Sequence, residues 1–195
     1  MSTRGLFGFR SNGIDKAVYN HSDSYPEWLG NNFVGFLIHN SENIPEIFSQ
    51  IETVDVNEKP TEEQKKLYKS MGWFNKSVSN RNDDDWYCLL YGIQDLTNWQ
   101  KAIDKNIPIY IENSIGFIKR SLHCEYAYIY DLDAESLEFY VGFQKAPDEN
   151  NRYGQKDDDG YYPCRLIHVF PMEEMKKEGP DQITEKMVNC QRLGY

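Results

Sequence analysis

The chain of 195 residues is within the range of one domain and carries a formal charge of −10. Hydrophobic residues make up 39% and charged residues 27%, a balance that is typical of a folded protein and excludes a wholly disordered one. The negative charge disfavours direct binding to nucleic acid, and no stretch is apolar enough to predict a membrane span. We therefore expect one cytoplasmic domain over residues 1–195.

The first half of the chain predicts a hairpin followed by helices. Residues 4–20 alternate around Ser11-Asn12-Gly13, where Asn and Gly accept the positive φ that a tight turn requires. Asp23 or Ser24 is expected to cap a helix over residues 26–39. Further helices are expected over residues 42–52, from Pro60 through Leu67, and over residues 86–103 with a break near Gly92.

The second half predicts another hairpin. Residues 126–130 and 137–141 alternate cleanly on either side of a polar loop, and residues 165–170 predict a further strand before a charged helical tail. Residues 146–160 are rich in Pro, Asp, Asn and Gly, which indicates a loop, while residues 109–122 combine helical spacing with a β-rich composition. The chain therefore predicts an α+β fold, in which a largely antiparallel sheet, built from the N-terminal and C-terminal-half hairpins, packs against helices.

Three segments of the chain resemble a family of uncharacterised phage and prophage proteins. They read T-R-G-x-x-G-F at residues 3–9, N-H-x-D-S-Y-P-x-x-L-G at residues 20–30 and C-E-x-A-Y-x-x-D-L-D at residues 124–133. The resemblance implies a phage-type accessory protein in the host cell cytoplasm, without any activity that can be carried over. Together with the acidic charge and the many aromatic residues, it favours binding to a protein partner over catalysis, and inhibition of a host defence protein is the expected role.

The N-terminus offers an alternative function, an amide hydrolase of the N-terminal-nucleophile type. Removal of Met1 would leave Ser2 with a free α-amine that can act as the base for its own hydroxyl. Ser-Thr-Arg is similar to the Cys-Thr-Arg start of the conjugated-bile-acid hydrolase branch, in which a Cys stands in place of this Ser. That similarity covers three residues and implies catalytic roles for Ser2, Arg4, Asn20 and Asp23.

A third hypothesis places a small anionic ligand at the junction between the predicted hairpin and the helix that follows it. Backbone N–H groups at a helix start attract anions, and basic side chains of the hairpin could add positive charge. Capping and turn hydrogen bonds explain the same polar cluster without a ligand. The candidate ligand-binding residues are Arg4, Arg10, His21, Asp23 and Tyr25.

Two acidic triplets are the candidate contacts for a basic protein partner. Both lie in segments that are expected to be loops, and the candidates are Asp83, Asp84, Asp85, Trp86, Asp157, Asp158 and Asp159. Neither triplet has the spacing of an EF-hand calcium loop, and the histidines lack the spacing of metal ligands. We therefore expect no metal and no cofactor, and the four scattered cysteines are expected to be free thiols.

Overall fold

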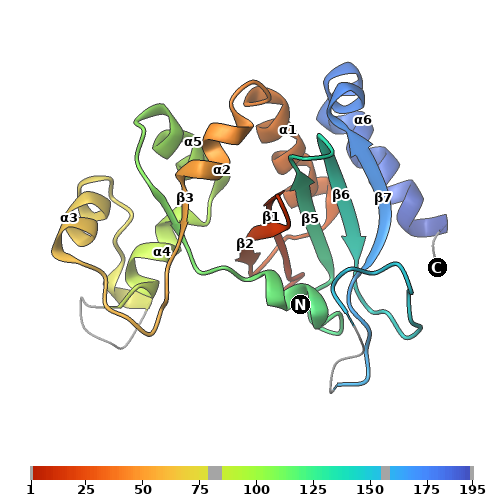
Figure 1. The fold of residues 1–195 in the computed structure, drawn as a ribbon, viewed down its shortest axis with the longest axis horizontal. Coiled ribbons are helices and arrows are strands. Elements are labelled where there is room, and N and C mark those ends of the chain that lie inside the picture. Colours follow the sequence, from red (N-terminus) through yellow and green to blue (C-terminus); the bar gives the residue numbers. More distant parts are fainter. Residues whose placement is uncertain (1, 79–84, 155–158, 194–195) are drawn as a thin grey trace. The chain divides into compact units, whose positions relative to one another are not determined.

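The computed structural model describes residues 2–78, 85–154 and 159–193. The chain divides into two compact units, one formed by Met1–Phe48 with Ser114–Tyr195 and the other by Ser49–Asn113. The predicted α+β class is confirmed, because helices pack with a mostly antiparallel sheet (Figure 1). Each unit has its own core, so the hypothesis of a single domain stays a prediction.

The larger unit is built on a five-stranded sheet with the order β2-β1-β5-β6-β7. Both predicted hairpins are confirmed, since β1 pairs antiparallel with β2 and β5 pairs antiparallel with β6. The pairing of β1 with β5 is parallel and joins the two hairpins into one sheet. The strands are β1 (Gly5–Ser11), β2 (Ile14–Asn20), β5 (Tyr126–Asp131), β6 (Ser136–Val141) and β7 (Arg165–Pro171).

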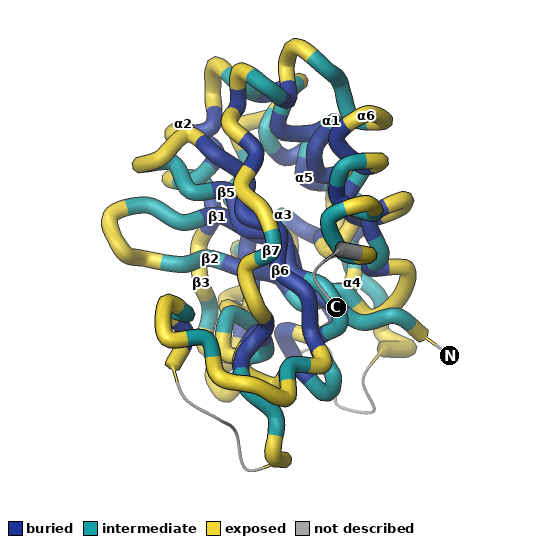
Figure 2. The backbone as a smooth tube through the Cα atoms, turned by 90° about the vertical axis from the view of Figure 1, so that its right-hand side faces the viewer, coloured by how far each residue is buried: buried dark blue, intermediate teal, exposed yellow. Residues whose placement is uncertain are grey.

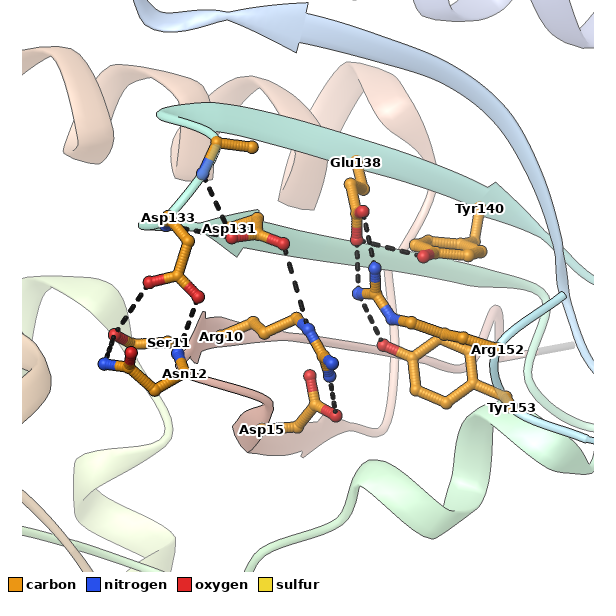
Figure 3. A network of polar contacts seen from close by, with 11 residues as sticks. Arg10, Ser11, Asn12, Asp15, Asp131, Asp133, Glu138, Tyr140, Arg152 and Tyr153 are labelled. Atoms are coloured by element: carbon orange, nitrogen blue, oxygen red, sulfur yellow. Dashed lines mark hydrogen bonds and ion pairs between the residues drawn. The ribbon is translucent and has the colours of Figure 1, made fainter. Parts of the chain in front are cut away.

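The turn between β1 and β2 has the predicted geometry. Asn12 and Gly13 have φ values of 49° and 79°, the left-handed conformation that a two-residue turn requires. The Asn12 N–H also donates to the Asp133 carboxylate at 2.6 Å (Figure 3). This contact ties the tip of the first hairpin to the loop of the second.

Helices cover one face of this sheet. The predicted helix over residues 26–39 is confirmed, although its first turn is a π-helix, η1 (Pro26–Gly30), which continues into α1 (Asn31–His39). Phe33 of α1 lies 5.3 and 5.6 Å, between ring centroids, from Phe7 and Phe9 of β1. The C-terminal helix α6 (Met172–Leu193) adds buried Met175, Ile183 and Met187, and it is kinked at Gly179, where φ is 80°.

The opposite face of the sheet carries a second apolar layer. A short 3-10 helix, η3 (Ile115–Lys119), packs there against the strands, together with Tyr153 of the predicted loop and Cys164, which follows that loop. The four cysteines are free, and Cys124 and Cys164 are both fully buried in this layer. Side chains of the sheet that belong to the layer are Leu6, Ala17, Ala127, Ile129 and Tyr140.

The smaller unit contains short helices and a two-stranded parallel sheet. The predicted helix after Pro60 is confirmed and has a full capping box, in which Thr61 and Gln64 bond each other's backbone. The two predicted pieces of residues 86–103 are also confirmed, but they meet at Asp95, whose carboxylate caps the second piece. The elements are β3 (Ile51–Thr53), α3 (Glu62–Ser70), η2 (Lys76–Val78), α4 (Tyr87–Ile93), α5 (Leu96–Asp104) and β4 (Ile109–Ile111).

Two segments differ from the sequence-based expectation. The helix expected over residues 42–52 is the shorter α2 (Ile44–Gln50), because Ile51 already belongs to β3 and pairs with Ile109. Residues 109–122, with their mixed signals, form neither one helix nor one strand. They contain β4 followed by η3, so each of the two competing signals describes one part of the segment.

Aromatic side chains fill the core of the smaller unit. Trp99 is fully buried, and its indole N–H donates to the Ile93 carbonyl at 2.6 Å. The Tyr68 hydroxyl donates to the Pro108 carbonyl at 3.0 Å and accepts from the Tyr110 N–H at 2.9 Å. These bonds satisfy the polar ends of buried rings, so the rings contribute apolar burial without an unpaired polar atom.

Candidate functional site

The N-terminal residues that the hydrolase hypothesis names lie at one end of the sheet. Ser2 is exposed, and its hydroxyl donates to the His21 carbonyl. The Arg4 N–H donates to the Glu125 carboxylate at 3.2 Å, and the Arg4 carbonyl accepts the Glu125 N–H at 2.8 Å. The Arg4 guanidinium lies 3.3 Å from Nδ1 of His123. The Ser2 hydroxyl therefore bonds a carbonyl acceptor on the protein surface, and Met1 lies outside the described residues.

The polar junction after β2 is held by hydrogen bonds within itself. The expected side-chain cap is wrong, because no side chain caps η1. Asp23 instead takes a positive φ of 56°, and its carbonyl accepts the Leu29 N–H at 3.3 Å. Ser24 is fully buried with its hydroxyl 2.7 Å from Nδ2 of Asn20, and its carbonyl accepts the Tyr128 hydroxyl at 2.9 Å. The Ser24 side chain is therefore used in the turn, and Asp23 contributes its backbone carbonyl instead of its carboxylate.

The five predicted anion-binding residues do not converge. Arg4 precedes β1 and Arg10 stands near its end, and six residues of extended strand separate them by roughly 20 Å. Arg10 is bound to Asp15 at 2.7 Å and lies 3.8 Å from Asp131, so its charge is already compensated. His21 and Asp23 are exposed at the same end of the sheet as Arg4, where β1 begins and β2 ends, so Arg10 is the residue that lies apart. The structure therefore separates Arg10 from the other predicted residues, and an anion site at the junction after β2 stays a prediction.

The predicted acidic contacts have different environments. Asp83, Asp84, Asp157 and Asp158 lie outside the described residues. Asp85 is 6% exposed and accepts the Tyr87 N–H at 3.0 Å, and Trp86 packs against Tyr110 in the smaller unit. Both residues are buried at the start of α4, so neither lies on the surface, and their role as partner contacts stays a prediction. Asp159 is exposed and accepts the N–H of Tyr161 at 2.9 Å.

A partly buried ion pair lies on the second apolar layer of the larger unit, with side-chain exposures of 29% for Arg152 and 10% for Glu138 (Figure 3). Arg152 forms a bidentate pair with Glu138, one of whose two hydrogen bonds measures 2.6 Å. The same guanidinium donates to the Tyr153 hydroxyl at 2.9 Å, and Glu138 accepts the Tyr140 hydroxyl at 2.9 Å. The pair was not predicted, although a glutamate inside the apolar strand over residues 137–141 is the signal that could have indicated it.

The surroundings of this pair change the proton affinities of its members. Burial raises the pKa of Tyr140 well above its usual range. Burial opposes the charge of Arg152, but its hydrogen bonds to Glu138 raise the pKa of the guanidinium above the ordinary value. The phenol and the guanidinium therefore keep their protons, and opposite charges compensate each other. Such a network fixes the segment that contains Arg152 on the sheet and does not supply a free acid or base.

Alkaline pH is expected to destabilise the protein through its buried tyrosines. Burial raises the pKa of Tyr130 and of Tyr153 to about 12. Because the neutral phenol is favoured in the folded state, this stability is complete below pH 10 and is lost as the pH rises towards 12. Urea unfolding at pH 8 and 11 should show a loss of about 1 kcal/mol for each of these tyrosines. Tyr153→Phe should reduce the decrease in the free energy of unfolding between pH 8 and 11. An unchanged decrease would show that Tyr153 does not contribute to the loss of stability.

The outermost strand β7 has an open edge. It pairs with β6 alone, and within the described residues no other strand lies beside it. Most of its seven residues are exposed, as Figure 2 shows, and two of the exposed side chains are the large apolar Leu166 and Val169, with exposed fractions of 37% and 39%. An open strand with exposed apolar side chains is a template for another strand.

The register places these two apolar side chains on one face. Leu166 lies opposite Tyr140 and Val169 lies opposite Glu138, with an irregularity in the pairing between them. Tyr140 and Glu138 are two residues apart and point to the same face of β6, so their partners do too. The bulge therefore gathers Leu166 and Val169 into one apolar patch beside the open edge.

The register also fixes which backbone groups face the edge. The Met172 N–H donates to the Glu135 carbonyl at 2.9 Å, in the same register that pairs Leu137 with Phe170. Alternate residues of an antiparallel strand turn their backbone groups towards the neighbouring strand. Phe170 therefore bonds β6, and the N–H and the carbonyl of Val169 point outward.

The opposite edge of the sheet is closed. The Ala17 carbonyl of β2 accepts the N–H of Ser114 at 2.8 Å, and Lys16 donates to the Phe48 carbonyl at 2.8 Å. Aromatic contact between Tyr19 and Phe117 packs η3 against the same strand. Within residues 2–78, 85–154 and 159–193, β7 is therefore the more open of the two edges for strand addition.

Comparison of the chain with protein-family models, with curated proteins and with solved structures finds no match. In the described parts of the chain, no helix combines the length and the apolar composition that are needed to cross a membrane. Function must therefore be argued from the geometry of this molecule.

Proposed function

We propose that the protein acts by binding a protein partner, which adds an extended segment to β7. The observation that carries the proposal is the open edge of β7, with the outward backbone groups of Val169 and the apolar patch of Leu166 and Val169. Strand addition uses backbone hydrogen bonds for affinity and pockets or patches for specificity. A partner strand would bond the outward N–H and carbonyl of Val169 and cover the patch.

The composition of β7 supports this role. Natural proteins usually protect an open edge with lysine, inward-pointing charges or proline within the strand. The strand Arg165–Pro171 contains no lysine and no acidic residue, and its proline is the last residue, beyond the outward-facing Val169. The protective features of β7 lie at its two ends, in Arg165 and Pro171, and in the bulge, which here brings the apolar side chains together.

The charge of the protein favours a basic partner. The chain carries a formal charge of −10, which attracts a basic surface and speeds its encounter with the protein. The resemblance of the three sequence segments to phage and prophage proteins supports an accessory role, in which the bound partner is a component of host defence that is inhibited by the complex.

Val169→Pro is expected to abolish capture of the partner. Proline removes the outward N–H but no hydrogen bond to β6, because Val169 faces away from that strand. Tagged protein would be used to capture a partner from bacteria that carry defence systems, and surface plasmon resonance would then measure the purified pair. We expect affinity to fall at least about tenfold, while the control Val169→Thr, which keeps the N–H, changes it by less than about threefold.

The same measurement tests the charge of the partner. Raising the salt concentration from about 0.05 to about 0.5 M shortens the Debye length from roughly 14 to roughly 4 Å, so association with a basic partner should slow. Circular dichroism of each variant controls for folding. A partner that binds Val169→Pro as tightly as the unchanged protein would overturn strand addition.

A further inference from the structure

A cleft of about 610 Å³ opens in the larger unit, away from the polar network. It lies between η1, the start of β5 and the last turns of α6, and its volume is in the range of pockets that bind small molecules. Its lining combines two phenols, one carboxylate, one guanidinium, one amide and one aliphatic side chain. These belong to Tyr25, Tyr126, Glu27, Arg192, Gln191 and Val188.

Hydrogen bonds hold the walls of this cleft. Asn31, directly after η1, donates to Thr184 of α6 at 3.2 Å, which fixes these two elements against each other. Gln191 donates to the Tyr126 hydroxyl at 2.8 Å, and so joins α6 to β5. The Tyr128 hydroxyl holds the carbonyl of Ser24, immediately before the cleft residue Tyr25. The cleft is therefore built on fixed elements, as a binding site requires.

The two charges of the cleft come from different walls. Glu27 belongs to η1 and Arg192 to α6, and both are exposed. Within the described residues, neither side chain forms an ion pair. A ligand with separate positive and negative groups would find an uncompensated counter-charge for each.

The remaining lining residues suit an apolar body between two charged groups. Burial, with a further contribution from the nearby Glu27 carboxylate, raises the pKa of Tyr126, so this phenol stays neutral. The rings of Tyr25 and Tyr126 and the Val188 side chain offer apolar contact, and the ring faces also attract an ammonium group.

We propose that this cleft binds a small zwitterion of the amino-acid class. The ammonium group contacts Glu27 and the tyrosine rings, the carboxylate contacts Arg192, and the side chain lies against Val188. This site does not depend on β7 or on the proposed strand addition, and it contains only Tyr25 of the residues that the sequence indicated for an anion.

The test is an NMR titration of the full chain with L-phenylalanine and L-leucine. Shifts should appear at the side-chain amide of Gln191 with millimolar or tighter affinity. Phenylalaninamide, which lacks the carboxylate, and N-acetylphenylalanine, which lacks the ammonium group, should each bind at least about tenfold more weakly than L-phenylalanine. Absence of binding by both amino acids, or equal binding of the three phenylalanine compounds, would overturn the proposal.

Matched substitutions assign the two charges. Arg192→Gln should lower the affinity for L-phenylalanine at least about fivefold but change the affinity for phenylalaninamide by less than about twofold. Glu27→Gln should also lower the affinity for L-phenylalanine at least about fivefold, but it should change the affinity for N-acetylphenylalanine by less than about twofold. Lys177→Gln and Glu185→Gln remove one positive and one negative charge at exposed positions of α6 outside the cleft, and they should leave affinity unchanged. Equal losses in the cleft variants and these controls would contradict the assigned contacts.

Discussion

Trp99→Ala is expected to lower the free energy of unfolding by about 3 to 5 kcal/mol, the range for deletion of a fully buried large aromatic side chain. Trp99 has no exposed surface, and it is the largest fully buried side chain of the protein's described residues. The change leaves a cavity in the core of the smaller unit and leaves the Ile93 carbonyl without the indole donor. Urea unfolding followed by circular dichroism measures the loss.

Trp28→Ala is the matched control for this substitution. Trp28 is 59% exposed on η1, so the same chemical change should cost well under about 1 kcal/mol. Hydrogen exchange would locate the effect, since Trp99→Ala should weaken the protection of amides within Ser49–Asn113. If Trp99→Ala lowers the free energy of unfolding no more than Trp28→Ala does, the burial of Trp99 does not stabilise the core of the smaller unit.

Arg152→Met is expected to destabilise the protein by about 1 to 3 kcal/mol, because Arg152 is itself partly exposed and water screens part of the charge that is left on Glu138. The substitution keeps the apolar stem but leaves the Glu138 carboxylate, whose side chain is 10% exposed, without its cation. Removing one member of a buried pair is costly, because the other charge stays desolvated. Thermal and urea unfolding at pH 7 measure the change.

The double variant Arg152→Met with Glu138→Gln is the control for the ion pair. Glutamine keeps an oxygen that can accept the Tyr140 hydroxyl but carries no charge. The double variant should therefore recover about 1 to 2 kcal/mol relative to Arg152→Met alone. If the two substitutions simply add, the cost does not come from an unpaired buried charge.

Local signals predicted the hairpins and most helices of this fold. The positive φ of Asn12 and Gly13, the capping box of Thr61 and the alternation in β5 and β6 each depend on a few neighbouring residues. The parallel pairing of β1 with β5 joins residues that are far apart in the sequence, and no local pattern encodes it. The strands β3 and β4, with three residues each, are too short for a periodic signal.

The candidate sites were less predictable for the same reason. The acidic run at residues 83–85 predicted that Asp85 lies on an acidic surface, but its carboxylate accepts a backbone N–H at the start of α4. Strand 165–170 was predicted, yet its place at the sheet edge follows from the order of all five strands. Glu27 and Arg192 meet in one cleft because α6 packs on η1, and this tertiary contact has no signature in either segment.

The parallel contact between β1 and β5 also has a consequence for synthesis of the chain. The first hairpin is complete at Asn20, but its neighbour in the sheet begins only at Tyr126. At roughly 5 to 20 residues per second, the ribosome finishes the hairpin several seconds before that neighbour emerges. During this interval β5, β6 and β7 have not been synthesised, so Phe7 and Phe9 lie on a two-stranded hairpin. The edge of β1 that later bonds β5 is unpaired. The nascent hairpin therefore has an unpaired strand edge, which favours aggregation, until the second hairpin is synthesised.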